Sequence, residues 1–152
     1  MANPVTRPAV ARFVSIANRA TFGGKETKYE ITLLFDKTDA AALTPLKEAA
    51  VAAAQTKYGA LQGIGFPFVD GDTKDYRGYA GRIAVKFSSN YRPQVVDADL
   101  NPILDIENDL YDGCVVRVSY NCWTADKPNK HVAFGVMAIQ KLADAINAGI
   151  TA

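Results

Sequence analysis

The segment from Lys74 to Arg92 combines cationic and aromatic side chains in close alternation. It contains five cations, a single acid (Asp75) and four aromatic residues. The cations are Lys74, Arg77, Arg82, Lys86 and Arg92, and the aromatic residues are Tyr76, Tyr79, Phe87 and Tyr91. Cations neutralise phosphates, and each ring that stacks on a base contributes about 1–3 kcal/mol without requiring a particular base. The segment therefore predicts a surface that binds single-stranded nucleic acid.

The strand pattern around these residues divides them between two faces. Between residues 81 and 88, Ile83, Val85 and Phe87 alternate with Arg82 and Lys86, which is the two-residue period of a β-strand. Phe87 is therefore expected in the core and is not a candidate for base stacking. Composition also allows a second interpretation, in which the cations solvate an ordinary sheet face and the tyrosines cover its edges.

A second strand is expected from residue 114 to residue 123. Its apolar face comprises Cys114, Val116, Val118, Tyr120 and Cys122, and its other face comprises Val115, Arg117, Ser119, Asn121 and Trp123. Trp123 is the only tryptophan, and a polar strand face is an unusual place for a core residue. Arg117 and Trp123 therefore join the candidate binding residues, although Trp123 could also pack under a loop.

The next segment, residues 94–112, is acidic and has two metal-binding interpretations. Asp97, Asp99 and Asn101 match the first ligand positions of a calcium-binding EF-hand loop, but Pro102 replaces the required glycine and Asn108 the terminal glutamate. The other interpretation is a two-metal nuclease, although no histidine or lysine lies nearby in the sequence. Carboxylates that serve solvated turns are the simplest explanation.

The rest of the chain offers little catalytic chemistry. The sequence has one histidine, His131, and two cysteines, Cys114 and Cys122, which are too few soft ligands for the usual zinc sites. Both cysteines are expected to be packing thiols, and their separation along one strand excludes a disulfide between them. No phosphate-binding loop, dinucleotide-binding motif or serine nucleophile motif occurs. We expect a protein that is not an enzyme.

The elements that must position these residues are mostly strands. Further strands are expected at residues 9–16, 28–35 and 131–141, with Gly23-Gly24 as a hairpin connection. A scaffold helix is expected between Asp39 and Tyr58, with Thr44 as N-cap, Pro45 as the first helical residue and Gly59 as its end. Residues 59–78 are expected to form a long loop. Five strands with one inserted helix predict an all-β fold, a small barrel.

Length and charge set the wider limits. The 152 residues suffice for one packed domain, and 17 Lys and Arg against 16 Asp and Glu leave a formal net charge of +1. Any electrostatic function must therefore come from local segregation of charge. The longest apolar run is far too short for a membrane span, and the first residues lack a secretory signal, so a cytosolic protein is expected.

Several short strings stand out along the chain: Phe68 to Asp72 (FVDGD), Tyr91 to Asp97 (YRPQVVD), Pro102-Ile103 followed by Leu110 to Val118 (LYDGCVVRV), and Phe134 to Lys141 (FGVMAIQK). Together they resemble a family of phage single-stranded-DNA-binding proteins. The resemblance lies in the order and spacing of these strings over most of the chain. Members of this family are similar to the replication-associated binding proteins of podophages.

The resemblance implies a five-stranded OB-fold (oligonucleotide/oligosaccharide-binding) barrel over residues 1–152. It implies sequence-nonspecific coating of single-stranded DNA (ssDNA) during phage replication, recombination and repair, in the cytoplasm of the infected bacterial host, without a metal or nucleotide cofactor. Its partners would be ssDNA and phage replication or recombination proteins. Whether the protein forms a homo-oligomer is left open. Many such proteins end in an acidic tail, whereas Leu142 to Ala152 contains only Asp144. Partner recruitment through this end is therefore left open.

Pattern and resemblance together predict one DNA-binding groove. Its expected phosphate contacts are Arg77, Arg82, Lys86, Arg92 and Arg117, and its expected stacking residues are Tyr76, Tyr79, Tyr91 and Trp123. The main alternative is a phage structural or protein-interaction module that uses the same aromatic surface and has no affinity for DNA. A metal-dependent nuclease built on the acids between Asp97 and Asp112 is the third hypothesis.

Overall fold

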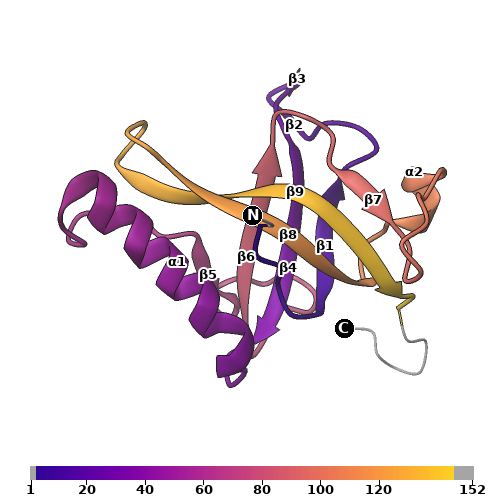
Figure 1. Ribbon diagram of the computed structural model, residues 1–152, viewed down its shortest axis with the longest axis horizontal. Coiled ribbons are helices and arrows are strands. Elements are labelled where there is room, and N and C mark those ends of the chain that lie inside the picture. The colour runs from indigo at the N-terminus through magenta and orange to yellow at the C-terminus, as the bar shows by residue number, and fades with distance from the viewer. Residues whose placement is uncertain (1–2, 146–152) are drawn as a thin grey trace.

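The computed structural model describes residues 3–145, and five of its strands close into a barrel (Figure 1). The barrel strands are β1 (Ala9–Ser15), β4 (Tyr29–Asp36), β6 (Arg82–Ser89), β8 (Val115–Ala125) and β9 (His131–Ala143). Antiparallel pairing links them in the order β6, β4, β1, β8, β9, and a short parallel contact between β6 and β9 closes the ring. The predicted five-stranded all-β barrel with an inserted helix is confirmed.

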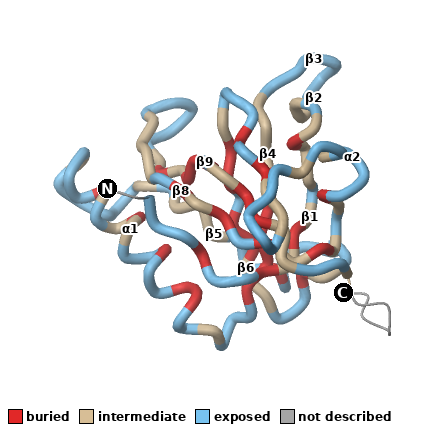
Figure 2. The backbone as a smooth tube through the Cα atoms, turned by 45° about the vertical axis from the view of Figure 1, so that its right-hand side comes forward, coloured by how far each residue is buried: buried red, intermediate tan, exposed pale blue. Residues whose placement is uncertain are grey.

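Alternating residues of the five strands fill the barrel with apolar side chains. The Phe87 and Phe134 rings stack at 5.4 Å between centroids, and Tyr120 meets both of them edge-on. Cys114 lies in this core as a free thiol, and burial raises its pKa, as expected of a packing residue. Figure 2 shows buried residues along the strands and on one side of the helix. The core therefore consists of the inward strand faces that the two-residue period predicts.

The inserted helix α1 (Ala40–Tyr58) packs against β8 and β9 through its buried residues. It begins earlier than predicted, because the Asp39 side chain accepts a hydrogen bond from the Ala42 N–H at 3.1 Å and so forms the N-cap. Pro45 lies inside the helix, so the prediction of an N-cap at Thr44 is wrong. Gly59 ends the helix in a left-handed conformation, as predicted. Within residues 3–145, no helix is long and apolar enough to span a membrane.

Short elements decorate the connections between the barrel strands. Gly23 and Gly24 form the turn of a small hairpin between β2 (Thr21–Phe22) and β3 (Lys25–Glu26), so the predicted glycine turn is present but belongs to an arm beyond β1 and β4. The acidic segment contains β7 (Gln94–Val96), which pairs with β9, and a one-turn helix, α2 (Ile106–Asp109). These elements are too short to give a recognisable period in the sequence.

The segment predicted as one long loop contains a strand and a helical turn. β5 (Phe68–Asp70) pairs with β6, and the 3-10 turn η1 (Gly71–Thr73) follows. Lys37 anchors this turn, since its Nζ lies 2.6 Å from an Asp70 carboxylate oxygen and 2.5 Å from one of Asp72. The hydrogen bonds from Lys37 lower the pKa of both carboxyl groups. The start of the segment that contains residues 74–80 is therefore fixed to the barrel.

Gly71 should be intolerant of any side chain, because a Cβ there would lie 2.0 Å from the Tyr79 carbonyl oxygen and 2.6 Å from that of Arg82. Both obstacles are backbone, so Gly71→Ala should lower the free energy of unfolding by more than about 2 kcal/mol in urea denaturation. The control is Gly63→Ala, which meets open space and suffers only the cost of a positive φ, about 1–2 kcal/mol. A smaller loss for Gly71→Ala than for Gly63→Ala would contradict the steric argument.

Candidate nucleic-acid interface

Two adjoining depressions on the outer barrel surface share Lys28, Ser88 and Trp123. Each has a volume of about 470 Å³. One extends over the β8–β9 pair towards Tyr91, and the other extends over β6 towards Lys86. We call them together the Trp123 groove, whose main lining residues are Lys28, Glu30, Lys86, Ser88, Tyr91, Asn121, Trp123, His131 and Met137.

Trp123 lies at the centre of this groove, half-buried on the outward face of β8. Lys28 Nζ lies 4.6 Å from the centroid of the indole ring, and the His131 ring meets it edge-on at 6.3 Å. Because Lys28 and Trp123 are adjacent, a base stacked on the indole would have a cation at hand for its phosphate. Sequence reasoning did not select Lys28, although its place on the polar face of the strand after Gly24 was a usable signal.

Two further predicted residues join Trp123 in the groove. The Lys86 side chain is 61% exposed, and its ammonium lies 3.6 Å from a Glu30 carboxylate oxygen. Exposed ion pairs of this kind are weak, so the Lys86 ammonium can exchange Glu30 for a phosphate. Tyr91 is 82% exposed, and its backbone N–H is held by the Ser89 hydroxyl at 3.1 Å. The structure thus brings together Lys86, Tyr91 and Trp123 of the predicted set.

Gly135 forms part of the groove floor, at the point where β8, β9 and β6 meet. It pairs with Asn121 on one side and with Ser88 on the other. A Cβ at this position would lie 2.1 Å from Asn121 Oδ1, so a side chain here would push the Asn121 amide from its place across β9. The absence of a side chain at Gly135 therefore sets the position of the Asn121 amide on the groove floor.

Arg92 is occupied by the protein itself. Its guanidinium donates to the carbonyl oxygens of Ile16 and Ala17, at 3.2 and 2.6 Å. It also lies over the Tyr29 ring, 5.5 Å from the centroid, and Arg19 lies over the same ring at 4.8 Å. These contacts join the β1–β4 connection to the segment after β6. The Arg92 guanidinium is therefore held in one position beside the groove.

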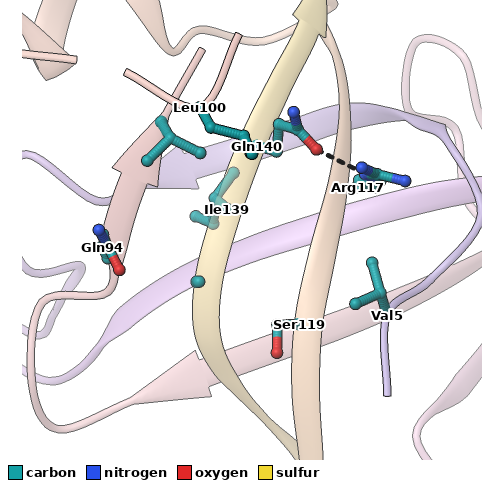
Figure 3. A pocket seen from close by; sticks show the side chains of 9 residues that line it. Val5, Gln94, Leu100, Arg117, Ser119, Ile139 and Gln140 are labelled. Carbon is teal, nitrogen blue, oxygen red and sulfur yellow. Dashed lines mark hydrogen bonds between the residues drawn. The ribbon is translucent and has the colours of Figure 1, made fainter. Parts of the chain in front are cut away.

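Arg117 lies in a different pocket, of about 410 Å³, between β7, β9, β8 and the N-terminal segment (Figure 3). Its Nε donates to Gln140 Oε1 at 2.6 Å, and the Gln140 amide in turn donates to the carbonyl oxygens of Asp97 and Ala98. Val5 and Leu100 flank this pocket. Arg117 shares the outward face of β8 with Trp123, as predicted, but no lining residue connects the two depressions.

The remaining predicted residues gather elsewhere, over the outer face of β1, β4 and β6. Tyr79 is only 5% exposed, because it covers Leu34 and Ala84, and it is therefore not available for base stacking. Arg82 is held by Asp36 at 3.1 Å and by the Gly78 carbonyl. Tyr76 and Arg77 are exposed. The structure thus divides the predicted set between the Trp123 groove, the Arg117 pocket and this outer face.

Three of the six acids between residues 94 and 112 are used locally in turns and caps. The Asp97 carboxylate accepts from the backbone N–H groups of Asp99 and Asn101, both at 2.9 Å, and Asp105 caps α2. Asp112 accepts from the Val14 N–H. The described residues contain no group of three His, Cys, Asp or Glu side chains that could hold a metal ion. These contacts support the interpretation as turn carboxylates.

Comparison with known proteins gives the family. A family model described as the ssDNA-binding protein of Enterobacter phage Enc34 matches residues 5–150. The chain belongs to the Enc34 ssDNA-binding protein family. This family consists of DNA-binding proteins and not of enzymes, in agreement with the expectation from the sequence. The predicted relation to phage ssDNA-binding proteins is confirmed.

Solved structures show how widely the fold of the Enc34 family extends. The Enc34 protein in complex with ssDNA superposes with a TM-score of 0.80 at 18% identity, over 95% of this chain and 88% of that one. The ssDNA-binding protein gp2.5 of bacteriophage T7 gives a TM-score of 0.61 at 14% identity, over 97% and 95%. At these identities the likeness establishes the OB-fold barrel alone.

A curated relative shares part of the sequence. Putative protein p50 of Acyrthosiphon pisum secondary endosymbiont phage 1 is 32% identical over 75 residues. The match covers 49% of this chain and 41% of that protein, so this member of the Enc34 family spans less than half of the relative's length in the alignment.

Substituting the groove floor should show a specific coupling. Gly135→Ala should lower the free energy of unfolding by at most about 1 kcal/mol, because the new methyl group meets the end of the Asn121 side chain, which can turn away. In the double variant with Asn121→Ala most of this loss should return, and urea denaturation of the four proteins in the cycle measures the coupling. Equal losses with and without the Asn121 amide would show that the collision is not with that side chain.

Proposed function

We propose that the protein binds ssDNA without sequence preference, through the Trp123 groove. The observation that carries the proposal is the indole of Trp123, with Lys28 beside it, in two adjoining open depressions, of which one contains Lys86 and the other Tyr91. Exposed rings stack on any base and cations pair with any phosphate, so this lining suits a ligand of variable sequence. Membership of the Enc34 family supports the same ligand.

The place of the groove on the barrel supports this proposal. OB folds bind oligonucleotides on the outer face of their second and third strands and between the loops that flank it. Here these strands are β4 and β6, which supply Glu30, Lys86 and Ser88. The flanking loops are residues 16–28, which supply Lys28, and residues 126–130 before His131.

We propose a biological setting in keeping with the family. The protein coats and protects ssDNA during replication, recombination and repair of phage DNA, in the cytoplasm of the infected bacterial host. It acts without a metal or nucleotide cofactor, and its partners are ssDNA and phage replication or recombination proteins. Residues 146–152, which make up most of the C-terminal end considered above for partner recruitment, lie outside the described residues.

Titration of a fluorescent oligodeoxythymidylate at several salt concentrations tests the proposal. Trp123→Ala should weaken binding about 5-fold or more, equally for thymidine and cytidine oligomers, because stacking is lost without any change in base reading. Lys86→Ala should also weaken binding and reduce the slope of log affinity against log salt by about 0.7, the value for one phosphate contact on a single strand.

The control is Lys47→Ala, which removes an exposed cation from α1, away from the groove. It should leave both affinity and salt slope unchanged. Absence of binding by the unmodified protein at low salt would overturn the proposal and favour the protein-interaction module. Equal effects of Lys47→Ala and Lys86→Ala would place the DNA elsewhere on the surface. Cleavage of the oligomer on addition of magnesium or manganese would revive the nuclease hypothesis.

A further inference from the structure

Strand register places Trp123 at one end of a row of residues that passes around the barrel from β8 to β1. Trp123 pairs with Ala133, and extending the β9–β6 register by one residue places Ala133 beside Lys86. Lys86 pairs with Thr32, which is buried, and Thr32 pairs with Arg12. Neighbouring strands lie about 4.8 Å apart, so the four steps span about 19 Å along the surface. The row runs across the strands and ends on β1.

A second aromatic group lies at the β1 end of this row. Phe13 follows Arg12, and its ring meets Tyr76 edge-on at 5.4 Å and Tyr79 at 6.2 Å. Tyr76 and Tyr79 meet each other at 5.1 Å. We call these three residues the Phe13 cluster. Tyr79 is its buried base, whereas Phe13 is 45% and Tyr76 49% exposed, so two rings project into solvent from a fixed support.

The backbone of Phe13 is strained to hold its ring in this position. Its φ is 51°, in the left-handed region, which is rare for a bulky residue. The β1–β4 register shifts between Arg12 and Ser15, as expected of a bulge that redirects a side chain. Burial does not explain the strain, because nearly half of the ring is exposed. Such strain commonly marks a binding site.

One cation contacts the Phe13 cluster, and two more lie on the same segment as Tyr76. The Arg12 guanidinium lies 5.0 Å from the centroid of the Phe13 ring, and Lys74 and Arg77 on the adjoining segment are exposed. Arg12 meets Asp112 only at 3.5 Å, and its buried Nε has no hydrogen-bond partner among the described residues. Exposed rings beside cations repeat, at the far end of the row, the chemistry of the Trp123 groove.

We propose that Phe13 and Tyr76 form a second stacking platform for the same ssDNA strand that occupies the Trp123 groove. This inference rests on the proposed function and adds the path of the DNA. The strand crosses the barrel along the row, passes Lys86 midway and stacks one or more bases at each end. Oligonucleotides too short to span about 19 Å occupy the Trp123 groove alone, whereas longer ones engage both platforms.

A length series tests this path. Affinities are measured by anisotropy for oligodeoxythymidylates from about 3 to about 24 nucleotides, so that the shortest cannot reach both platforms and the longest exceed the site covered by a single OB fold. The variants are Phe13→Gly and Tyr76→Leu. Glycine adopts a φ of 51° without strain, and leucine keeps an apolar side chain over Tyr79, so both proteins should fold. Thermal unfolding checks this, and Leu104→Ala, at a residue 94% exposed in the acidic segment, is the control.

Both variants should bind the shortest oligomers like the unmodified protein and the longest ones about 5-fold or more weakly, while Leu104→Ala changes neither. Unchanged affinity for the long oligomers would overturn the second platform, as would an equal loss at every length. Trp123→Ala distinguishes this failure from failure of the proposed function. If Trp123→Ala leaves binding of the short oligomers intact, the groove itself is wrong, and the second platform falls with it.

Discussion

The parallel contact between β6 and β9 is the constraint on which the surface of this protein depends. It comprises only the pairs Phe87 with Phe134 and Ser88 with Gly135. The inward pair stacks in the core, and the outward pair forms the groove floor. Without this closure β6 would not lie beside β9, and Lys86 would not share a depression with Trp123. The same short contact therefore completes the hydrophobic core and assembles the candidate site.

Local segregation of charge replaces net charge in this protein. With a formal charge of +1, the chain as a whole exerts little attraction on DNA. Acids such as Asp97 are engaged in turns of residues 94–112, whereas Lys28 and Lys86 line an open groove in which Glu30 is the one lining acid among the described residues. The groove beside Trp123 therefore carries a small local excess of positive charge. Screening by salt should therefore act mainly on this face.

The sequence predicted the barrel better than the site. Alternation is a local property, so the strands and the outward position of Trp123 could be read directly, as could the removal of Phe87 to the core. The register between strands that are distant in sequence decides which outward residues share a surface. This register brings Lys28 beside Trp123 but places Arg117 in another pocket. Tyr79 and Arg82 likewise pack against partners that only the fold brings near. The bulge at Phe13 interrupts the pairing of β1 with β4, but the order of apolar and polar residues in β1 gives no sign of it.

The two arginines on the Tyr29 ring have a consequence for the time course of binding. Arg19 and Arg92 each donate two hydrogen bonds to backbone carbonyl oxygens, so these donors are not free to hold a phosphate. Their positive charges nevertheless stand beside the groove, and a fixed charge attracts a polyanion at a distance without touching it. Such charges raise the association rate, whereas residence time depends on the contacts made after docking. In the proposed mode of binding, Arg19 and Arg92 therefore attract the DNA, whereas the residues that line the Trp123 groove hold it.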